Sequence, residues 1–172
     1  MGKSRAFTLV ELLVVILIIG VLAAVAVSQY RKAVAKSRVM QLVVRADAIY
    51  KASQVYYLAN EFYPSDLRKL DLGVEEAGAT YGKTTISTGE HVGIIYNGDA
   101  AGIRCALVGS AAVTTSSIFC TDYDYAIIIY PATGKRYCRN RSKTKLAGEV
   151  CRSMAIGEGE EQPGGYMDYP LN

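Results

Sequence analysis

Most of the patterns that mark a catalytic or metal site are missing from this sequence. Its 172 residues include a single histidine, His91, and they contain no nucleophile elbow, no glycine-rich phosphate loop and no Cys-x-x-Cys pair. Such patterns position a nucleophile, a nucleotide or a structural metal ion. Without them, nothing in the sequence indicates an enzyme, a cofactor or a metal site.

An excess of charge of one sign is also missing. The formal net charge is +3, and Lys3 and Arg5 supply two of these charges, so that removal of residues 1–6 would leave +1. Attraction to the phosphates of a nucleic acid needs a strongly basic surface. The overall charge therefore gives no reason to expect nucleic acid as a partner.

Charged side chains are almost absent from residues 7–27, an apolar run of 21 residues that contains only Glu11. A helix of about 20 apolar residues can cross a bilayer. A carboxylate in such a helix is unfavourable unless another group neutralises it, so Glu11 is expected to have a specific role. Because Lys3 and Arg5 precede the run, the positive-inside tendency places the N-terminus in the cytoplasm and the remainder outside.

A cleaved secretory signal peptide is the alternative interpretation of this segment. Its support is the small-residue sequence Ala24-Val25-Ala26, which resembles a signal-peptidase site. However, the apolar run is longer than the apolar core of about 7–15 residues that signal peptides have, and Glu11 lies inside it. We therefore expect the helix to be retained.

Proline and glycine are absent from residues 28–60, so we expect the helix to continue to Asn60, with Pro64 just beyond its end. Two apolar strips recur along it at helical spacing. We expect one strip to pack on the globular domain of the same chain and the other on neighbouring helices, although both could belong to one core. The first strip is Ala33, Met40, Val44, Ala48, Val55 and Leu58, and the second is Leu42, Ile49 and Tyr56.

Beyond the helix, residues 61–156 are expected to form a globular domain. After a short capped helical turn at residues 65–70, short β-rich runs follow one another with no long helix between them, which predicts an antiparallel sheet packed on the outer half of the helix. The fold class is therefore α+β. Residues 157–172, acidic and rich in glycine and proline, are expected to form a flexible tail. The predicted strands are 91–97, 103–108, 117–120, 125–130 and 135–139.

All four cysteines lie beyond residue 100, as expected for an exported domain in an oxidising compartment. Four cysteines allow three pairings. We favour Cys105 with Cys120 and Cys138 with Cys151, because each pair closes a short local loop. Each bond would stabilise the domain by about 3 kcal/mol in the chain-entropy model.

A cluster of six basic residues lies within residues 135–145. It could contact DNA or an acidic surface, and the more ordinary interpretation is a solvated loop that complements the acidic tail of a neighbouring copy. The six residues are Lys135, Arg136, Arg139, Arg141, Lys143 and Lys145.

The N-terminus has a short basic leader, Met1–Ala6, followed by Phe7-Thr8-Leu9-Val10-Glu11-Leu12-Leu13. This arrangement resembles the N-terminus of type IV pilins and type II secretion pseudopilins. The resemblance implies a ladle-like fold with a long helix, cleavage between Ala6 and Phe7, and methylation of the new N-terminus at Phe7. Ala6 stands where most relatives have glycine.

The same resemblance implies roles within the apolar helix. Glu11 would be needed for methylation and assembly, its carboxylate meeting the Phe7 amine of a neighbouring subunit. A snorkelling or protonated Glu11 is the alternative. Gly20 would allow close approach of another helix, and ordinary packing without a specific role is the alternative. Helices of the family often unwind after this glycine, up to a proline whose place is taken here by Ser28.

Partners implied by the family are further copies of the chain, other pilins, the prepilin peptidase and an inner-membrane assembly platform. The protein would wait in the bacterial inner membrane and then enter an extracellular filament. A C-terminal disulfide loop such as 138–151 is typical of pilins rather than pseudopilins. A type II secretion pseudopilin, a minor pilin that binds DNA or another ligand, and a single-span protein that never assembles remain alternatives.

Overall fold

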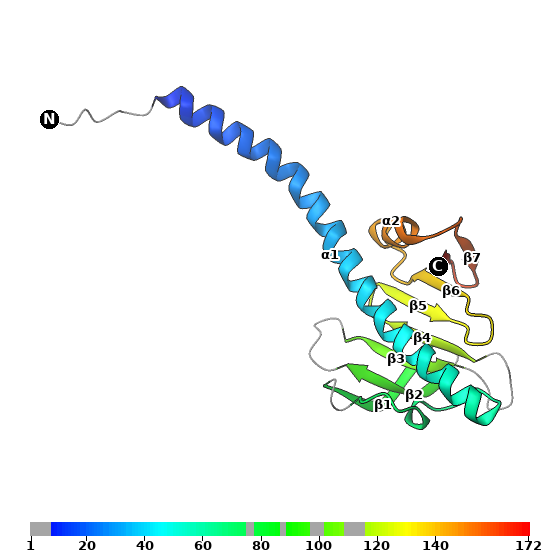
Figure 1. Ribbon diagram of the computed structural model, residues 1–172. Helices are drawn as coiled ribbons and strands as arrows, with labels where there is room; N and C mark the ends of the chain where they lie inside the picture. Colours follow the sequence, from blue (N-terminus) through cyan, green and yellow to red (C-terminus); the bar gives the residue numbers. More distant parts are fainter. Residues whose placement is uncertain (1–7, 75–77, 87–88, 97–101, 109–115) are drawn as a thin grey trace. The chain divides into compact units, whose positions relative to one another are not determined.

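The computed structural model describes residues 8–74, 78–86, 89–96, 102–108 and 116–172. The chain divides into two compact units, Met1–Ala35 and Lys36–Asn172, and each is considered by itself. The first unit contains the beginning of helix α1 (Leu9–Asn60), and the second contains the rest of α1, a shorter helix and an antiparallel sheet (Figure 1). The expected α+β class, with a long N-terminal helix and an antiparallel sheet, is confirmed.

Helix α1 ends at Asn60, as predicted. The Asn60 side chain donates a hydrogen bond from Nδ2 to the carbonyl oxygen of Tyr56 over 2.9 Å. The next residue, Glu61, has a left-handed φ of 63°, and its N–H donates to the carbonyl oxygen of Tyr57. These contacts satisfy carbonyl groups that the last helical turn leaves without a partner.

The predicted capped turn after α1 is also present, as the 3-10 helix η1 (Leu67–Lys69). Its N-cap is Asp66, whose carboxylate accepts a hydrogen bond from the N–H of Arg68 over 2.9 Å. Leu67 is fully buried, so this turn is attached to the core of the second unit.

The sheet has eight strands in the order β1-β2-β3-β4-β5-β6-β8-β7, and every pair of neighbours is antiparallel. All five predicted strands are present with small shifts at their ends. The strands are β1 (Ala79–Ile86), β2 (Gly89–Tyr96), β3 (Arg104–Val108), β4 (Ser117–Thr121), β5 (Tyr125–Ile129), β6 (Arg136–Asn140), β7 (Glu160–Gln162) and β8 (Tyr166–Leu171).

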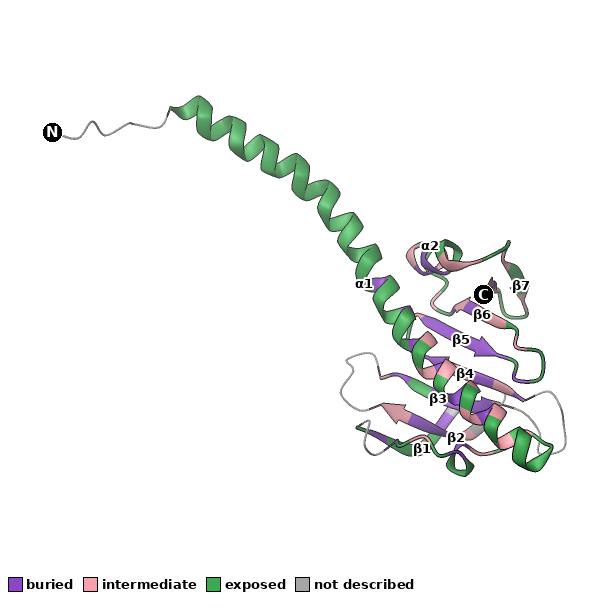
Figure 2. Cartoon of the chain, in the orientation of Figure 1, coloured by how far each residue is buried: buried purple, intermediate pink, exposed green. Residues whose placement is uncertain are grey.

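The core of the second unit lies between α1 and one face of this sheet (Figure 1). The strands in the middle of the sheet are largely buried (Figure 2). From α1, five side chains spaced three or four residues apart are buried, which places them on one side of the helix. They are Val39, Leu42, Ala46, Ile49 and Ser53.

Both favoured disulfides are present in the structure. Cys105 and Cys120 lie directly opposite each other in the β3–β4 ladder. Cys138 of β6 is joined to Cys151 of helix α2 (Lys145–Met154). The second bond therefore fixes α2 to the sheet.

Helix α2 was not predicted, because Gly148 lies in its middle and weakens the helical pattern. Its first turn is capped by Thr144, whose Oγ1 accepts from the N–H of Ala147. A β-carbon on Gly148 would lie 3.2 Å from Nδ2 of Asn140. Glycine at this position permits the close approach of α2 to β6.

The expectation of a flexible acidic tail at residues 157–172 is wrong. Strand β8 pairs with β6 over five residues, and β7 adds a final strand beside it. Asp168 of β8 is 5% exposed, and its two carboxylate oxygens accept hydrogen bonds of 2.6 and 2.7 Å from Arg139 of β6. This buried pair and the buried ring of Tyr169 hold the segment in the sheet.

We expect Arg139→Met to lower the free energy of unfolding by about 3 kcal/mol, because it leaves the buried Asp168 carboxylate without its partner. The measurement is chemical denaturation of the full chain in detergent micelles. The double variant Arg139→Met, Asp168→Leu should regain most of the loss, since it removes both charges. Equal stability of the single variant and the wild type would contradict the assignment.

Candidate assembly site

The only acidic side chain in the first turn of α1 bonds to the residue that precedes the helix. Oε2 of Glu11 accepts hydrogen bonds from the backbone N–H of Thr8 over 2.9 Å and from its Oγ1 over 2.8 Å. In return, Oγ1 of Thr8 accepts from the N–H of Glu11 over 3.3 Å. This reciprocal arrangement is a capping box, and it satisfies N–H groups that a helix N-terminus leaves without partners.

The capping box gives Glu11 a structural role within its own chain. A negative side chain in the first turn also interacts favourably with the positive end of the helix dipole. The roles predicted for Glu11 from the sequence, an intermolecular charge pair or else a snorkelling or protonated side chain, did not include this cap. The spacing Thr-x-x-Glu just before an apolar run was the signal that could have revealed the capping role.

Ala6 and Phe7, the residues on either side of the expected cleavage point, lie outside the described residues. Cleavage between them, methylation of Phe7, and the charge pair between its amine and Glu11 therefore remain predictions.

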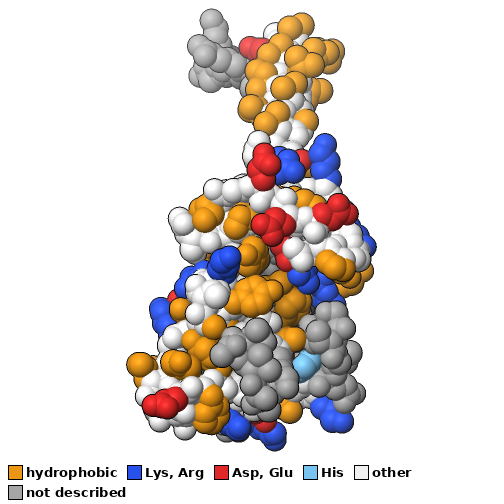
Figure 3. Space-filling model, turned by 90° about the vertical axis from the view of Figure 1, so that its right-hand side faces the viewer, with side chains coloured by type: hydrophobic (Ala, Val, Ile, Leu, Met, Phe, Trp, Pro, Cys, Tyr) orange, Lys and Arg blue, Asp and Glu red, His pale blue; other side chains and the backbone are white. Residues whose placement is uncertain are grey.

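The first unit exposes an apolar surface. Every large apolar side chain from Leu9 to Val27 is between 44% and 84% exposed, and hydrophobic side chains dominate the visible side of this segment (Figure 3). Among the described residues, α1 is the one helix long and apolar enough to cross a membrane. Within the described residues of the first unit, nothing covers this surface.

The helix is continuous through Gly20 and Ser28. A β-carbon on Gly20 would meet no described atom within 4 Å. The described contacts of this chain therefore do not require glycine there, so the expectation that it permits approach of another helix remains a prediction.

The two apolar strips on the outer half of α1 have different surroundings. Leu42 and Ile49 of the second strip are buried against the sheet, and Tyr56 is half-buried. All members of the first strip are exposed, with Val44 and Val55 at 65% and 67%. This outcome matches the expectation that only one strip packs within the chain.

Polar contacts at the flank of the buried side also fix α1 on the sheet. Asp47 accepts a hydrogen bond of 2.7 Å from Arg136 of β6 and lies 3.0 Å from Nζ of Lys51. The hydrogen bond from Lys51 and the nearby charge of Arg136 lower the pKa of Asp47. Nε2 of Gln54 donates to the carbonyl oxygen of Pro131 over 2.8 Å.

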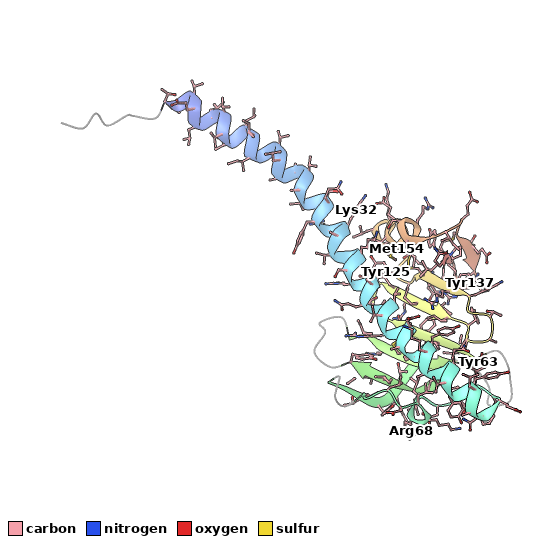
Figure 4. The ribbon with its side chains drawn as sticks, viewed as in Figure 1. Lys32, Tyr63, Arg68, Tyr125, Tyr137 and Met154 are labelled. Carbon is pink, nitrogen blue, oxygen red and sulfur yellow. A yellow bond between two sulfur atoms is a disulfide. The ribbon has the colours of Figure 1, made fainter. Side chains whose placement is uncertain are left out.

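The same carbonyl accepts a second hydrogen bond from beyond the helix. The hydroxyl of Tyr63, near the C-terminal end of α1 (Figure 4), donates to the oxygen of Pro131 over 3.0 Å. The side chain of Arg45 lies over the ring of Tyr96 of β2, with its guanidinium carbon 4.1 Å from the ring centroid. Contacts at both ends of this helical segment therefore set which of its sides faces outward.

The six basic residues of 135–145 do not form one patch. Arg136 points to α1, whereas Arg139 lies on the opposite face of β6 and pairs with Asp168. Arg141 donates to the carbonyl oxygen of Asp122 over 2.7 Å, and Lys143 donates to that of Gly164 over 2.6 Å. Successive residues of a strand alternate between faces, which is why charges that cluster in sequence are dispersed here.

Metal ligands are not grouped in the described ranges. No three His, Cys, Asp or Glu side chains among those residues are arranged so that they could hold a metal ion. Asp122 instead accepts hydrogen bonds at Oδ1 from the N–H groups of Asp124 and Tyr125, which shapes the β4–β5 turn.

Comparison with known proteins centres on the N-terminal segment. Residues 1–27 match the family model described as the prokaryotic N-terminal methylation motif. The type IV major pilin PilE of Neisseria gonorrhoeae is 35% identical over 80 residues, which cover 46% of this chain and 47% of that protein. The chain is therefore similar to type IV pilins, and its N-terminal segment carries the methylation motif.

Two further proteins, a fimbrial protein and a pilin, are similar to this chain. A fimbrial protein of Moraxella nonliquefaciens is 29% identical over 63% of this chain and 75% of its own length. The type IV major pilin PilA of Myxococcus xanthus is 31% identical over 46% of this chain and 36% of its own length. The chain thus spans about half the length of the gonococcal relative and about a third of the Myxococcus one. No solved structure matches significantly.

We expect Thr8→Ala to open the first turn of α1, because it removes the Oγ1 atom that accepts from the Glu11 N–H. Amide hydrogen exchange at Glu11 in detergent micelles should be about fivefold faster than in the wild type. Thr8→Ser, which keeps the oxygen, is the matched control and should exchange like the wild type. Wild-type exchange in Thr8→Ala would show that no such cap exists.

Proposed function

We propose that this chain is a structural subunit of a type IV pilus-like filament. It assembles through α1 after the prepilin peptidase cuts between Ala6 and Phe7, and before assembly it waits in the inner membrane with its N-terminus in the cytoplasm. The observation that carries the proposal is the uncovered apolar surface from Leu9 to Val27 behind a methylation motif. Lipid covers this surface in the precursor, and neighbouring α1 helices cover it in the filament.

In this proposal Glu11 has two successive roles. In the free subunit its carboxylate caps α1 through Thr8. In the filament it also neutralises the amine that cleavage creates on Phe7 of a neighbour. An unpaired charge in an apolar layer is strongly unfavourable, so pairing would fix the register between subunits.

The first strip supplies the second contact surface. Its exposed apolar side chains continue along the outer half of α1, and a hollow of 330 Å³ beside Met40 and Val44 gives room for a side chain from a neighbouring helix. Two contact zones on one helix, one before and one after residue 35, would hold each subunit to more than one neighbour.

Two observations separate this proposal from its alternatives. The disulfide between Cys138 and Cys151 supports a pilin over a type II secretion pseudopilin. The intrachain contacts of Arg136, Arg139 and Arg141 reduce the basic surface that a DNA-binding minor pilin would use. A homopolymer with its own copies as main partners is therefore the function that we propose.

The role of Glu11 can be tested with two variants that both lack its charge but differ in whether they can cap the helix. Glutamine at the third helical position can still close a capping box, whereas alanine cannot. If charge pairing drives assembly, both Glu11→Gln and Glu11→Ala should abolish filaments seen by electron microscopy, while immunoblots show normal subunit levels in the membrane. Filaments of Glu11→Gln at wild-type abundance would contradict charge pairing, and would leave capping as the role of this residue.

The first strip can be tested separately. We expect Val44→Glu combined with Val55→Glu to remove filaments but leave the thermal stability of the subunit unchanged, because both side chains are exposed in the chain itself. The matched control is Ile156→Glu, an exposed apolar residue outside α1 (61% exposed). Normal filaments in the double variant, or equal loss in the control, would rule out the first strip as a contact surface.

A further inference from the structure

The face of the sheet turned away from α1 carries a cavity that the proposed assembly does not use. Arg136 of β6 reaches Asp47 on α1, so the next residue, Tyr137, lies on the opposite face. Arg139 shares that face, and its partner Asp168 lies across from it on β8.

The cavity measures 360 Å³, within the range of about 300–1,000 Å³ that small-molecule sites occupy. It is formed by the β5–β6 turn, by β6, and by the β7–β8 hairpin, all inside the second unit. No residue of α1 lines it. The side chains that matter below are Tyr130, Lys135, Tyr137, Glu160, Gln162 and Asp168.

Two tyrosine rings form an apolar corner of this cavity. The rings of Tyr130 and Tyr137 are perpendicular, with an interplanar angle of 87° and centroids 6.0 Å apart. Tyr130 is 38% exposed, so part of its ring remains available to a ligand. Exposed aromatic surface beside polar groups is typical of a binding site rather than of a core.

The charges around the corner are balanced. Asp168 is buried at 5% exposure, and Arg139 donates to both of its oxygens, which neutralises it. Lys135 and Glu160 contribute one charge of each sign. The cavity therefore has no net charge with which to select an anion or a cation.

Its polar groups instead suit a ligand that both donates and accepts hydrogen bonds. Lys135 donates, Glu160 accepts, and the amide of Gln162 does both. A sugar ring combines an apolar C–H face, which packs on an aromatic ring, with hydroxyl groups of this dual character. We propose that the cavity binds a neutral saccharide, whose ring packs on Tyr130 while Lys135, Glu160 and Gln162 hold its hydroxyls.

The test uses the full chain in micelles of a detergent without a sugar headgroup. The probes are lactose, maltose and N,N′-diacetylchitobiose, with sialyllactose as an anionic comparison, and binding is followed by isothermal titration calorimetry. At least one neutral disaccharide should bind saturably, and more tightly than sialyllactose. Tyr130→Ala should weaken that binding about tenfold or more, since it removes the packing ring.

Three controls make the result decisive. Tyr130→Phe keeps the ring and should retain most of the affinity, while Gln162→Ala should weaken binding with no change in thermal stability. Tyr123→Ala removes an exposed tyrosine at the opposite end of β5 (81% exposed) and should bind like the wild type. The proposal is overturned if no neutral disaccharide binds, if sialyllactose binds best, or if Tyr130→Ala binds as tightly as Tyr123→Ala. None of these variants lies on α1, so the outcome is separate from that of the filament proposal.

Discussion

The arrangement of this molecule depends on the need to remove one apolar surface from water. Burial of a single leucine, isoleucine or valine side chain is favourable by about 1.5–3 kcal/mol, and α1 carries many such side chains between Leu9 and Val27 with no described part of its own chain to cover them. In the proposed function, lipid or similar helices cover this surface. Glu11 is compatible with this surface because it lies in the first turn, where Thr8 and the helix dipole interact with its charge.

The second unit serves this helix by fixing the orientation of its outer half. Leu42 and Ile49 pack on the sheet, and the pair of Asp47 with Arg136 adds a polar contact at the flank. One side of α1 therefore packs within the chain, and the side that carries Val44 and Val55 is exposed. The two disulfides, which lie in β3–β4 and between β6 and α2, stabilise the support on which the helix rests.

The features that could be predicted from the sequence are those that depend on residues close together in the chain. The absence of proline and glycine from residues 28–60 predicted that the helix continues to Asn60, and the short loops between cysteines predicted both disulfides. It did not reveal which strip of α1 faces the sheet, because the buried side includes Ala46 and Ser53, small or polar residues that add little to an apolar pattern. Strand β8 was not predicted, because its signals are not local and because it contains a proline. Its position depends on Asp168 meeting Arg139, 29 residues away in the chain, and its Pro170 lies beyond the short pairing with β7, where a missing N–H is tolerated.

The account rests on α1 being retained, cut before Phe7 and buried among its own copies. The most direct test is the intact mass of the polypeptide in filaments sheared from the native cell surface. The account predicts a chain that begins at Phe7, carries a methyl group on its terminal amine and contains two disulfides. A filament polypeptide that still begins at Met1, or one trimmed to Val27, would contradict it.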